Sequence, residues 1–286
     1  MPLSIVVLIK QVPDTAAVST QAMKDDGTLN RSALPAVFNP DDMNALEMAL
    51  DLKERFEASV TVLTMGPAQA AEVLREALYM GADRAVLLTD RLFAGSDTLA
   101  TSFVLSQAIR HLGAADVILC GREAIDGNTA QVGPQVAEKL DMNQITYVDA
   151  IEQIDASKCS CWHEVEQGRE LAESKLPVLL TVTAAANTPR PFSAKRIMRY
   201  KNAKAPAECA PGAAPDALAR RGLLIEEWSA GTIGIDAAQC GLAGSPTRVQ
   251  KIESVVLAGR EFKKFAPDDS GIRALLEELI ADYTFD

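Results

Sequence analysis

DVILCGREAIDGNTAQVGPQVAEKL, residues 116–140, joins a short apolar run to an amphipathic segment through a turn around Gly127. The run 116–120 is apolar and is bounded by turn residues, which is typical of a buried strand. The segment that follows the turn runs into a helix. A strand that turns directly into a helix is the repeating unit of α/β folds, so this stretch indicates the fold class.

The same alternation extends through the first 150 residues. The sequence predicts strands at 4–9, 59–64, 84–88 and 116–120, and amphipathic helices at 41–56, 68–80 and 96–112. Asn39-Pro40 precedes the first helix, Gly81 follows the second and Asp97 caps the third, as expected at helix ends. Alternating strands and helices predict a doubly wound, mostly parallel sheet of the Rossmann-like type.

The pattern becomes rich in β-structure from residue 145 onward. Residues 162–166 and 169–173 flank Gln167-Gly168 as a hairpin, and 176–183 form a strongly apolar strand. The segment 188–215 contains five prolines and many basic residues, which predicts an exposed arm, and 270–283 is an amphipathic helix. We therefore expect an α/β domain at 1–190, including the hairpin, and an extended C-terminal arm with a terminal helix at 191–286.

Composition excludes several classes of function. The chain has 286 residues, of which 48% are hydrophobic, as in a soluble globular protein. Its 28 Lys and Arg against 39 Asp and Glu give a net charge of −11, which excludes nucleic acid and anionic membranes as expected partners. The apolar N-terminus lacks a basic lead-in and predicts a first strand rather than a signal peptide, and no run is long enough to span a bilayer.

The cysteines indicate a reducing compartment. There are five, an odd number at scattered positions, which predicts a cytoplasmic protein without disulfides. Cys159 and Cys161 are too close together for the usual zinc knuckle and have no second pair. We predict a surface hairpin there and no metal site.

Ligands of doubly wound sheets bind outside the carboxyl ends of the strands. This rule directs attention to 10–15, 65–67, 89–90 and 121–129. The corner at Gly127, Asn128 and Thr129 places a tight turn and a helix N-terminus where backbone N–H groups can bind an anion. Asn128 or Thr129 is a candidate cap for that helix, and Gly133 would allow a ligand to approach its first turn.

Two interpretations of the corner remain open. It contains neither a G-x-G-x-x-G fingerprint nor a Walker A loop, so a phosphate site and a simple strand-to-helix turn are about equally supported by the residues. The carboxylates of Glu123 and Asp126 would repel phosphate unless they point away. Asp126 either accepts N–H bonds within the turn or lies near the ribose or adenine of a nucleotide.

No side-chain set predicts catalysis by the chain itself. His111 and His163 stand alone, without a nucleophile at a recognisable spacing. We predict no catalytic residue, so any redox chemistry would have to come from a cofactor.

Several motifs together resemble one family. They are Val7–Thr15, Asn39–Asp42, Met65–Pro67, Ala77–Arg84, Ala124–Gly133 and Leu176–Val182. Each is weak alone, but in this order they resemble the beta subunit of electron-transfer flavoproteins, over most of the chain and most firmly over 1–200. The resemblance implies an adenine-nucleotide-binding domain and a heterodimer with a larger alpha subunit that carries an FAD.

The loop variant points to one branch of that family. Residues 126–134, DGNTAQVGP, resemble the D-G-D-T-A-Q-V-G-P of the electron-bifurcating type, with Asn128 in place of Asp, and 244–249 resemble a late motif of that type. The resemblance implies a second FAD in this subunit, electrons from NADH, a low-potential acceptor (ferredoxin or flavodoxin) and an acyl-CoA dehydrogenase or enoyl-CoA reductase partner. The alternatives are an ordinary beta subunit with structural AMP and a stand-alone nucleotide-binding sensor.

The resemblance also implies site residues. Those expected at the cofactor are Leu8, Ile9, Lys10, Val12, Pro13, Asn39, Pro40, Asp41, Asp42, Met65, Gly66, Gly121, Ala124, Ile125, Asp126, Gly127, Asn128, Thr129, Ala130, Gln131, Val132 and Gly133. Those expected at the dehydrogenase partner are Phe192, Ala194, Lys195, Arg196, Ile197, Met198 and Arg199, although Ala194 stands where a larger apolar anchor can sit.

Overall fold

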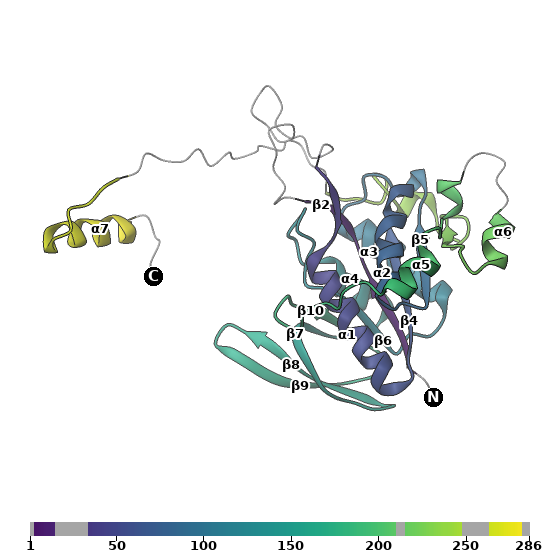
Figure 1. Ribbon diagram of the computed structural model, residues 1–286, viewed down its shortest axis with the longest axis horizontal. Coiled ribbons are helices and arrows are strands. Elements are labelled where there is room, and N and C mark those ends of the chain that lie inside the picture. The colour runs from purple at the N-terminus through teal and green to yellow at the C-terminus, as the bar shows by residue number, and fades with distance from the viewer. Residues whose placement is uncertain (1–2, 15–33, 210–214, 248–262, 282–286) are drawn as a thin grey trace, which may run out of the picture.

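The structure is a computed structural model that describes residues 3–14, 34–209, 215–247 and 263–281. The described residues form a nine-stranded sheet in the order β11-β5-β4-β1-β6-β10-β7-β8-β9 (Figure 1). Its strands are β1 (Ser4–Leu8), β4 (Ser59–Met65), β5 (Arg84–Leu88), β6 (Val117–Gly121), β7 (Asn143–Ile154), β8 (Lys158–Val165), β9 (Gly168–Lys175), β10 (Val178–Val182) and β11 (Glu226–Trp228). A separate antiparallel pair joins β2 (Gln11–Pro13) to β3 (Ala36–Phe38).

The sheet is parallel from β11 to β7 and antiparallel from β7 to β9. This arrangement confirms the predicted doubly wound, mostly parallel sheet with a hairpin. The hairpin strands are longer than predicted, and β7 joins the sheet beside β10. The chain passes from β1 outward to β4 and β5, then returns so that β6 lies on the other side of β1. This reversal creates a switch point at the carboxyl end of β1, where ligands of such sheets bind.

Five of the described helices lie where the sequence predicts them, and the two at 194–200 and 215–220 were not predicted. They are α1 (Pro40–Phe56), α2 (Ala71–Met80), α3 (Thr98–Leu112), α4 (Val132–Leu140), α5 (Ala194–Tyr200), α6 (Pro215–Arg220) and α7 (Asp269–Ala281), with short 3₁₀ turns at Ala68–Ala70, Arg91–Phe93, Pro206–Glu208 and Ala237–Gln239. Proline at the first position starts α1, and the Asp97 carboxylate accepts a bond from Ala100 N at the start of α3.

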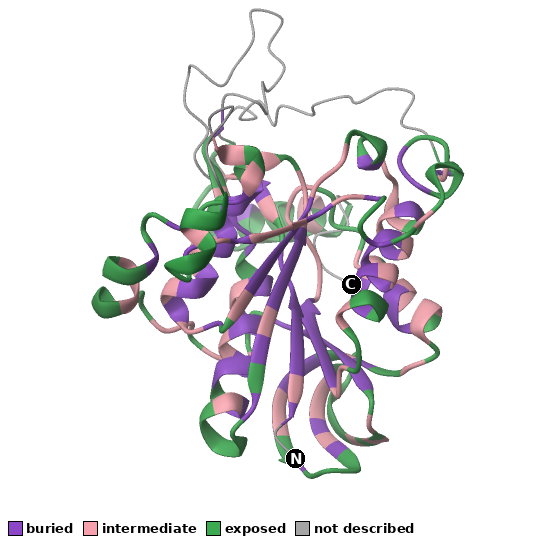
Figure 2. Cartoon of the chain, turned by 90° about the vertical axis from the view of Figure 1, so that its right-hand side faces the viewer, coloured by how far each residue is buried: buried purple, intermediate pink, exposed green. Residues whose placement is uncertain are grey.

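The two faces of the sheet carry separate apolar cores. Ile5 and Val7 of β1 belong to the core that includes α1 and α2, whereas Val6 and Leu8 belong to the core that includes α3 and α4. Successive side chains on a strand point to opposite faces, so the short apolar run of β1 serves both cores. Figure 2 shows that the central strands are buried along most of their length.

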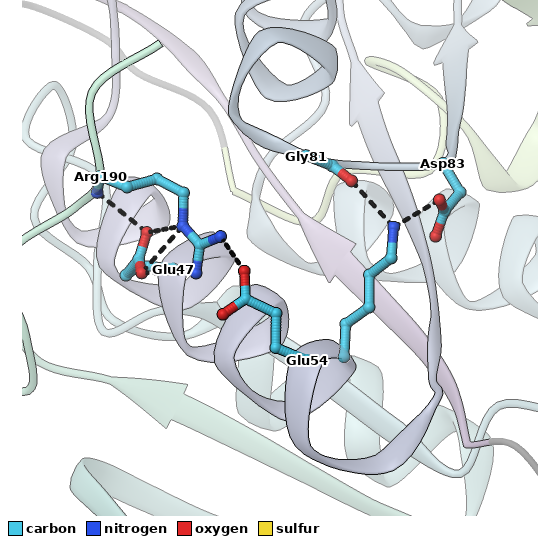
Figure 3. A network of polar contacts seen from close by, with 6 residues as sticks. Glu47, Glu54, Gly81, Asp83 and Arg190 are labelled. Atoms are coloured by element: carbon cyan, nitrogen blue, oxygen red, sulfur yellow. Dashed lines mark hydrogen bonds and ion pairs between the residues drawn. The ribbon is translucent and has the colours of Figure 1, made fainter. Parts of the chain in front are cut away.

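The prediction for the segment 188–215 is wrong in its middle part. It was expected to be an exposed arm, but its middle forms α5, which packs on α2, and Tyr200, Ala203 and Ala205 are buried. Arg190 holds the entry to α5 against α1 through Glu47 and Glu54 (Figure 3). These acceptors come from elements more than 100 residues away, so nothing local in the sequence predicts the packing.

The cysteine pair of the hairpin is buried. Cys159 and Cys161 lie inside β8 with both side chains fully buried and their sulfur atoms 3.3 Å apart. The prediction that this part of the hairpin lies at the surface is therefore wrong.

None of the described helices is long and apolar enough to cross a membrane, and no described group of three or more His, Cys, Asp or Glu is placed to hold a metal ion.

Candidate functional site

A cavity of about 990 Å³ opens at the carboxyl ends of β1, β4, β5 and β6. It therefore lies at the switch point of the sheet. Two walls enclose it. One is the loop that follows β6, residues 121–133, here called the nucleotide loop. The other is the far wall, residues 89–98, which joins β5 to α3.

The nucleotide loop presents backbone donors. The N–H groups of Gly127 and Asn128 donate to Ala124 O at 3.1 and 2.9 Å and close a tight turn. Asn128 and Ala130 both have a left-handed backbone, with φ of 49° and 50°. Within the described part of the chain, the N–H groups of Thr129 and Ala130 find no acceptor. Free N–H groups next to a helix start form a concave site for an anion.

Three details of this loop differ from expectation. Helix α4 begins at Val132, so neither Asn128 nor Thr129 caps it. A Cβ on Gly127 would meet nothing within 4 Å, whereas a Cβ on Gly133 would lie 2.8 Å from Cys120 Sγ. Gly133 is thus required for packing of α4 on the sheet, and it also lines the cavity. The left-handed backbone at 128 and 130 is incompatible with an α-helix, so α4 begins only after these residues.

The Asn128 side chain fastens the turn from inside. Its amide satisfies its neighbours in one orientation only, in which Nδ2 donates to the carbonyl oxygens of Ala124 and Ile125 at 3.0 and 3.1 Å. An aspartate in its place would offer only acceptors to these two carbonyls. Asn128 therefore stabilises the turn by donating two hydrogen bonds, in addition to lacking the negative charge of an aspartate.

Asp126 lies on the cavity wall and pairs with Lys10. Lys10 Nζ donates to both carboxylate oxygens, at 2.8 and 2.7 Å. This pair joins the end of β1 to the nucleotide loop. The Asp126 carboxylate accepts none of the turn's N–H groups. The interpretation in which Asp126 accepts N–H bonds within the turn is therefore wrong. Lys10 also offsets the negative charge that would otherwise repel a phosphate.

Asn39 and Asp42 hold the loop and the strand ends. The fully buried Asn39 accepts a bond from Ile125 N at 3.1 Å and donates to Glu123 O at 2.8 Å. Asp42 accepts bonds from Lys10 N and Gly121 N, each at 2.9 Å, and so joins the ends of β1 and β6. Burial raises the pKa of Asp42 to about 7. Both side chains point at backbone, which makes them supports of the site.

Arg122 supplies an unsatisfied donor. Its Nε is buried, lies 3.7 Å from the Asp41 carboxylate and makes no hydrogen bond within the described residues. A buried donor without a partner is unusual in a folded protein and fits a group that is bound from outside. Together with the free N–H groups and Lys10, it gives the cavity the donors that a phosphorylated nucleotide needs.

The structure brings most of the predicted cofactor residues together. Those that line the cavity are Leu8, Ile9, Lys10, Asp42, Met65, Gly66, Gly121, Ala124, Asp126, Gly127, Asn128, Thr129, Ala130, Gln131, Val132 and Gly133. Those that do not are Val12, Pro13, Asn39, Pro40, Asp41 and Ile125. Val12 and Pro13 form β2 instead of a ligand loop.

The prediction missed most of the far wall. It drew attention to Thr89 and Asp90 as residues that follow a strand, but it did not include Arg91 and 93–98, which also line the cavity. The apolar part of this wall is Phe93, which is 5% exposed, and α3 adds Leu105. The rule that ligands gather after parallel strands was the available signal, and it applies to β5 as much as to β6.

Comparison with known proteins gives consistent matches. A sequence profile described as the electron transfer flavoprotein domain matches residues 26–209. The electron transfer flavoprotein subunit beta of Clostridium acetobutylicum is 45% identical over 258 residues, 90% of this chain and 90% of that protein. Protein FixA of Bradyrhizobium diazoefficiens is 41% identical over 280 residues, 96% and 85%. The caffeyl-CoA reductase-Etf complex subunit CarD of Acetobacterium woodii is 41% identical over 268 residues, 93% and 89%.

Proposed function

This chain belongs to the electron transfer flavoprotein family as a beta subunit, and we propose that it forms a cytoplasmic heterodimer with an alpha subunit and holds FAD in the cavity. The FAD accepts electrons from NADH. One share passes to a low-potential acceptor, ferredoxin or flavodoxin, and the other passes through the alpha-subunit FAD to an enzyme of the acyl-CoA dehydrogenase type. Bound FAD supplies the redox chemistry, and the residues of this chain bind and orient it.

The size of the cavity carries the proposal. At about 990 Å³ it is at the upper end of the range for small-molecule sites, and it continues past the nucleotide loop to the far wall. AMP would occupy the loop side alone, whereas a dinucleotide would reach both walls. The far wall adds Phe93 and Leu105, which suit a planar apolar ring.

The positions of the hydrogen-bond donors favour binding of the phosphates on the side of the nucleotide loop. The free N–H groups at Thr129 and Ala130, the start of α4 and the Arg122 Nε lie there. The far wall carries the carboxylates of Asp90 and Asp97 and the cation of Arg91, and the loop side carries Glu123 and Asp126, which pair with Arg122 and Lys10. Because the free donors gather at the loop, the pyrophosphate belongs there, and the uncharged ring belongs against the apolar part of the far wall.

Cofactor content separates this proposal from its alternative. We expect the co-expressed heterodimer to contain two FAD and no AMP, counted after acid release by absorbance and chromatography. A heterodimer with one FAD and one AMP would establish the ordinary type with structural AMP. Lys10→Met should lower the FAD content of this subunit and leave the alpha-subunit FAD in place, and Lys175→Met on the exposed strand β9 serves as the control.

We also propose that α5 carries the dehydrogenase-binding surface. Met198 is 67% exposed and Phe192 is 39% exposed with its ring against Tyr79. The exposed cations Lys195 and Arg199 flank them. Arg196 is not available, because it donates to the carbonyl oxygens of Leu78 and Ala82 at the end of α2. An apolar centre with a charged rim is typical of a modest, specific interface.

One substitution tests this surface. Met198→Ser should weaken binding of the dehydrogenase about tenfold if Met198 fills a pocket on the partner. Reduction of the heterodimer by NADH should be unchanged, since α5 lies outside the cavity lining. Leu171→Ser, a similarly exposed change on β9, is the control. Equal binding by the Met198 and Leu171 variants would remove α5 from the interface.

The alpha subunit has a candidate contact in α7. This helix leaves Ile272, Leu276 and Ile280 exposed on one stripe, at 55%, 47% and 60%. An amphipathic helix with an uncovered apolar stripe requires a partner to bury it. Replacing the three residues with Ser should reduce recovery of the alpha subunit during co-purification.

A further inference from the structure

The far wall has little regular structure of its own. Between β5 and α3 it contains one 3₁₀ turn at Arg91–Phe93 and a left-handed Gly95, with φ of 74°. Most of its backbone bonds are short-range, such as Phe93 N to Asp90 O at 3.1 Å and Ser96 N to Phe93 O at 3.3 Å, and Thr89 N donates to Trp228 O at 3.0 Å. A loop of this kind needs contacts from elsewhere to keep one shape.

Beyond the bond to Trp228 and a bond from Ala230 N to Asp90 Oδ2 at 3.1 Å, those contacts come from residues 240–247, here called the late segment. Asp97 N donates to Ser245 Oγ at 2.9 Å, and the Ser245 hydroxyl donates to Gly241 O at 2.6 Å. Thr247 N donates to Asp97 Oδ2 at 3.0 Å, and the Thr247 hydroxyl donates to the same oxygen. The other oxygen of Asp97 accepts from Ala100 N at 3.0 Å and caps α3. Asp97 is therefore fixed by the late segment and fixes α3 in turn.

The fit between the two segments is also steric. Gly241 N donates to Ser96 Oγ at 3.1 Å, and Gly241 has φ of 54°. A Cβ at Gly241 would lie 2.2 Å from Leu92 O, so only glycine can lie this close to the wall. Leu242 covers Gly95, where a Cβ would lie 2.8 Å from Leu242 Cδ2. The late segment is shaped to the outer side of the far wall.

The wall is linked to the nucleotide loop through the next residue. Thr98 Oγ1 donates to Gln131 Oε1 at 3.1 Å and accepts from Gln135 Nε2 at 3.4 Å. A continuous series of contacts thus runs from Thr247 through Asp97 and Thr98 to Gln131 at the start of α4. None of residues 240–247 lines the cavity.

We propose that the late segment is a positioning element of the nucleotide site, with Ser245 and Thr247 as its positioning residues. It holds the far wall and the start of α3 in the shape that receives the nucleotide, and it acts without touching the ligand. The inference rests on the proposed function, because it requires that the cavity binds a nucleotide. It gives Ser245 and Thr247 a role in binding that their position outside the cavity conceals.

The test uses the heterodimer after removal of the cofactor of this subunit, titrated with FAD. Ser245→Ala together with Thr247→Val should weaken FAD binding about tenfold, as expected for the loss of hydrogen bonds to a charged group. Thr247→Ser alone keeps the N–H and hydroxyl donors and should bind FAD as the wild type does. The visible circular dichroism of the bound FAD should change in the double variant and not in Thr247→Ser.

Two measurements separate positioning from a general loss of structure. The unfolding temperature of the cofactor-depleted double variant should stay close to that of the wild type. Wild-type FAD affinity and an unchanged spectrum in the double variant would overturn the proposal. Titration with AMP tests the positioning role separately from the proposed function. A wild type that holds AMP instead of FAD would contradict the FAD assignment. Weaker AMP binding by the double variant would still support the positioning role of the late segment.

Discussion

Among single residues, Asp42 has the most unusual environment. Its buried carboxylate joins the backbone at the ends of β1 and β6 and lines the cavity. Burial raises its pKa from 3.8 to about 7, and the N–H bonds from Gly121 and Lys10 oppose this only in part. The carboxylate thus stabilises the strand ends at a cost in solvation. Buried ionisable groups of this kind gather at functional sites.

This pKa predicts a pH dependence. The folded chain holds the Asp42 proton more tightly than the unfolded chain, so the contribution of Asp42 to stability is greatest below about pH 4 and is lost as the pH rises through 7. The full loss is about 4 kcal/mol. Asp42→Asn lacks this titration, so its unfolding temperature relative to the wild type should rise between pH 5 and pH 8. A constant difference across that range would show that Asp42 does not titrate there.

Ala130 offers a second residue-scale prediction. Its φ of 50° is a conformation that glycine adopts freely and β-branched residues avoid. Ala130→Val should destabilise the chain by about 1–2 kcal/mol and lower its nucleotide content, because the loop must shift. Ala130→Gly, the matched control, should retain both properties within about 1 kcal/mol. Thermal unfolding and nucleotide counting measure both effects, and equal behaviour of the two variants would contradict the role assigned to this backbone.

At the scale of elements, long-range ion pairs hold the segment between β10 and α5. Arg190 bonds to Glu47 at 2.9 Å and to Glu54, both on α1 (Figure 3). Lys53 of α1 donates to Gly81 O at 3.0 Å, which ties α1 to the end of α2. The proposed docking surface on α5 is thus supported from α1 and α2, and its position depends on these contacts.

Removing the Arg190 contact should destabilise the chain measurably. Arg190 is 28% exposed and Glu47 is 14% exposed, so Arg190→Met leaves a mostly buried carboxylate without its guanidinium partner and with the backbone N–H of residue 190 as its remaining donor. We expect a loss of about 1–3 kcal/mol by chemical denaturation. Arg55→Met removes the exposed pair with Asp51 and should cost less than about 0.5 kcal/mol. A smaller loss for Arg190→Met than for Arg55→Met would show that α5 does not depend on this contact.

At the scale of the whole molecule, the charge is unevenly distributed. The net charge is −11, yet Lys195, Arg199, Lys201 and Lys204 are exposed together around α5. Arg190 and Arg196 are bound internally and do not add to this patch. A local cationic surface on an acidic protein favours encounter with an acidic face of a partner.

This distribution predicts a salt-dependent association. Lys195→Ala with Lys201→Ala should slow binding of the dehydrogenase about two- to fivefold at low ionic strength, and the difference should vanish at high salt, where these charges are screened. Lys175→Ala on β9 is the control for loss of an exposed lysine. Stopped-flow measurement at two salt concentrations decides the outcome. A difference that persists at high salt would mean that the lysines act by contact and not by steering.

The sequence by itself determined the strands β1, β4, β5, β6 and β10, the hairpin, the helices α1 to α4 and α7, the doubly wound class and the family. Apolar runs, apolar periodicity, helix caps and turn residues are local signals. The strand β1 is a short apolar run that is buried on both faces, and burial in α1 and α3 follows the helical period. Motifs such as 126–134 are contiguous, so family membership could be read without coordinates.

Only the tertiary structure decided the partners of the polar side chains. Asp126 pairs with Lys10, Asn39 holds the nucleotide loop instead of a ligand, and Asp97 meets Thr247 from 150 positions away. The order of the strands in the sheet sets these distances, and no local pattern encodes that order. The far wall was missed for the same reason, since β5 comes to lie beside the cavity only when β1 takes its place between β4 and β6.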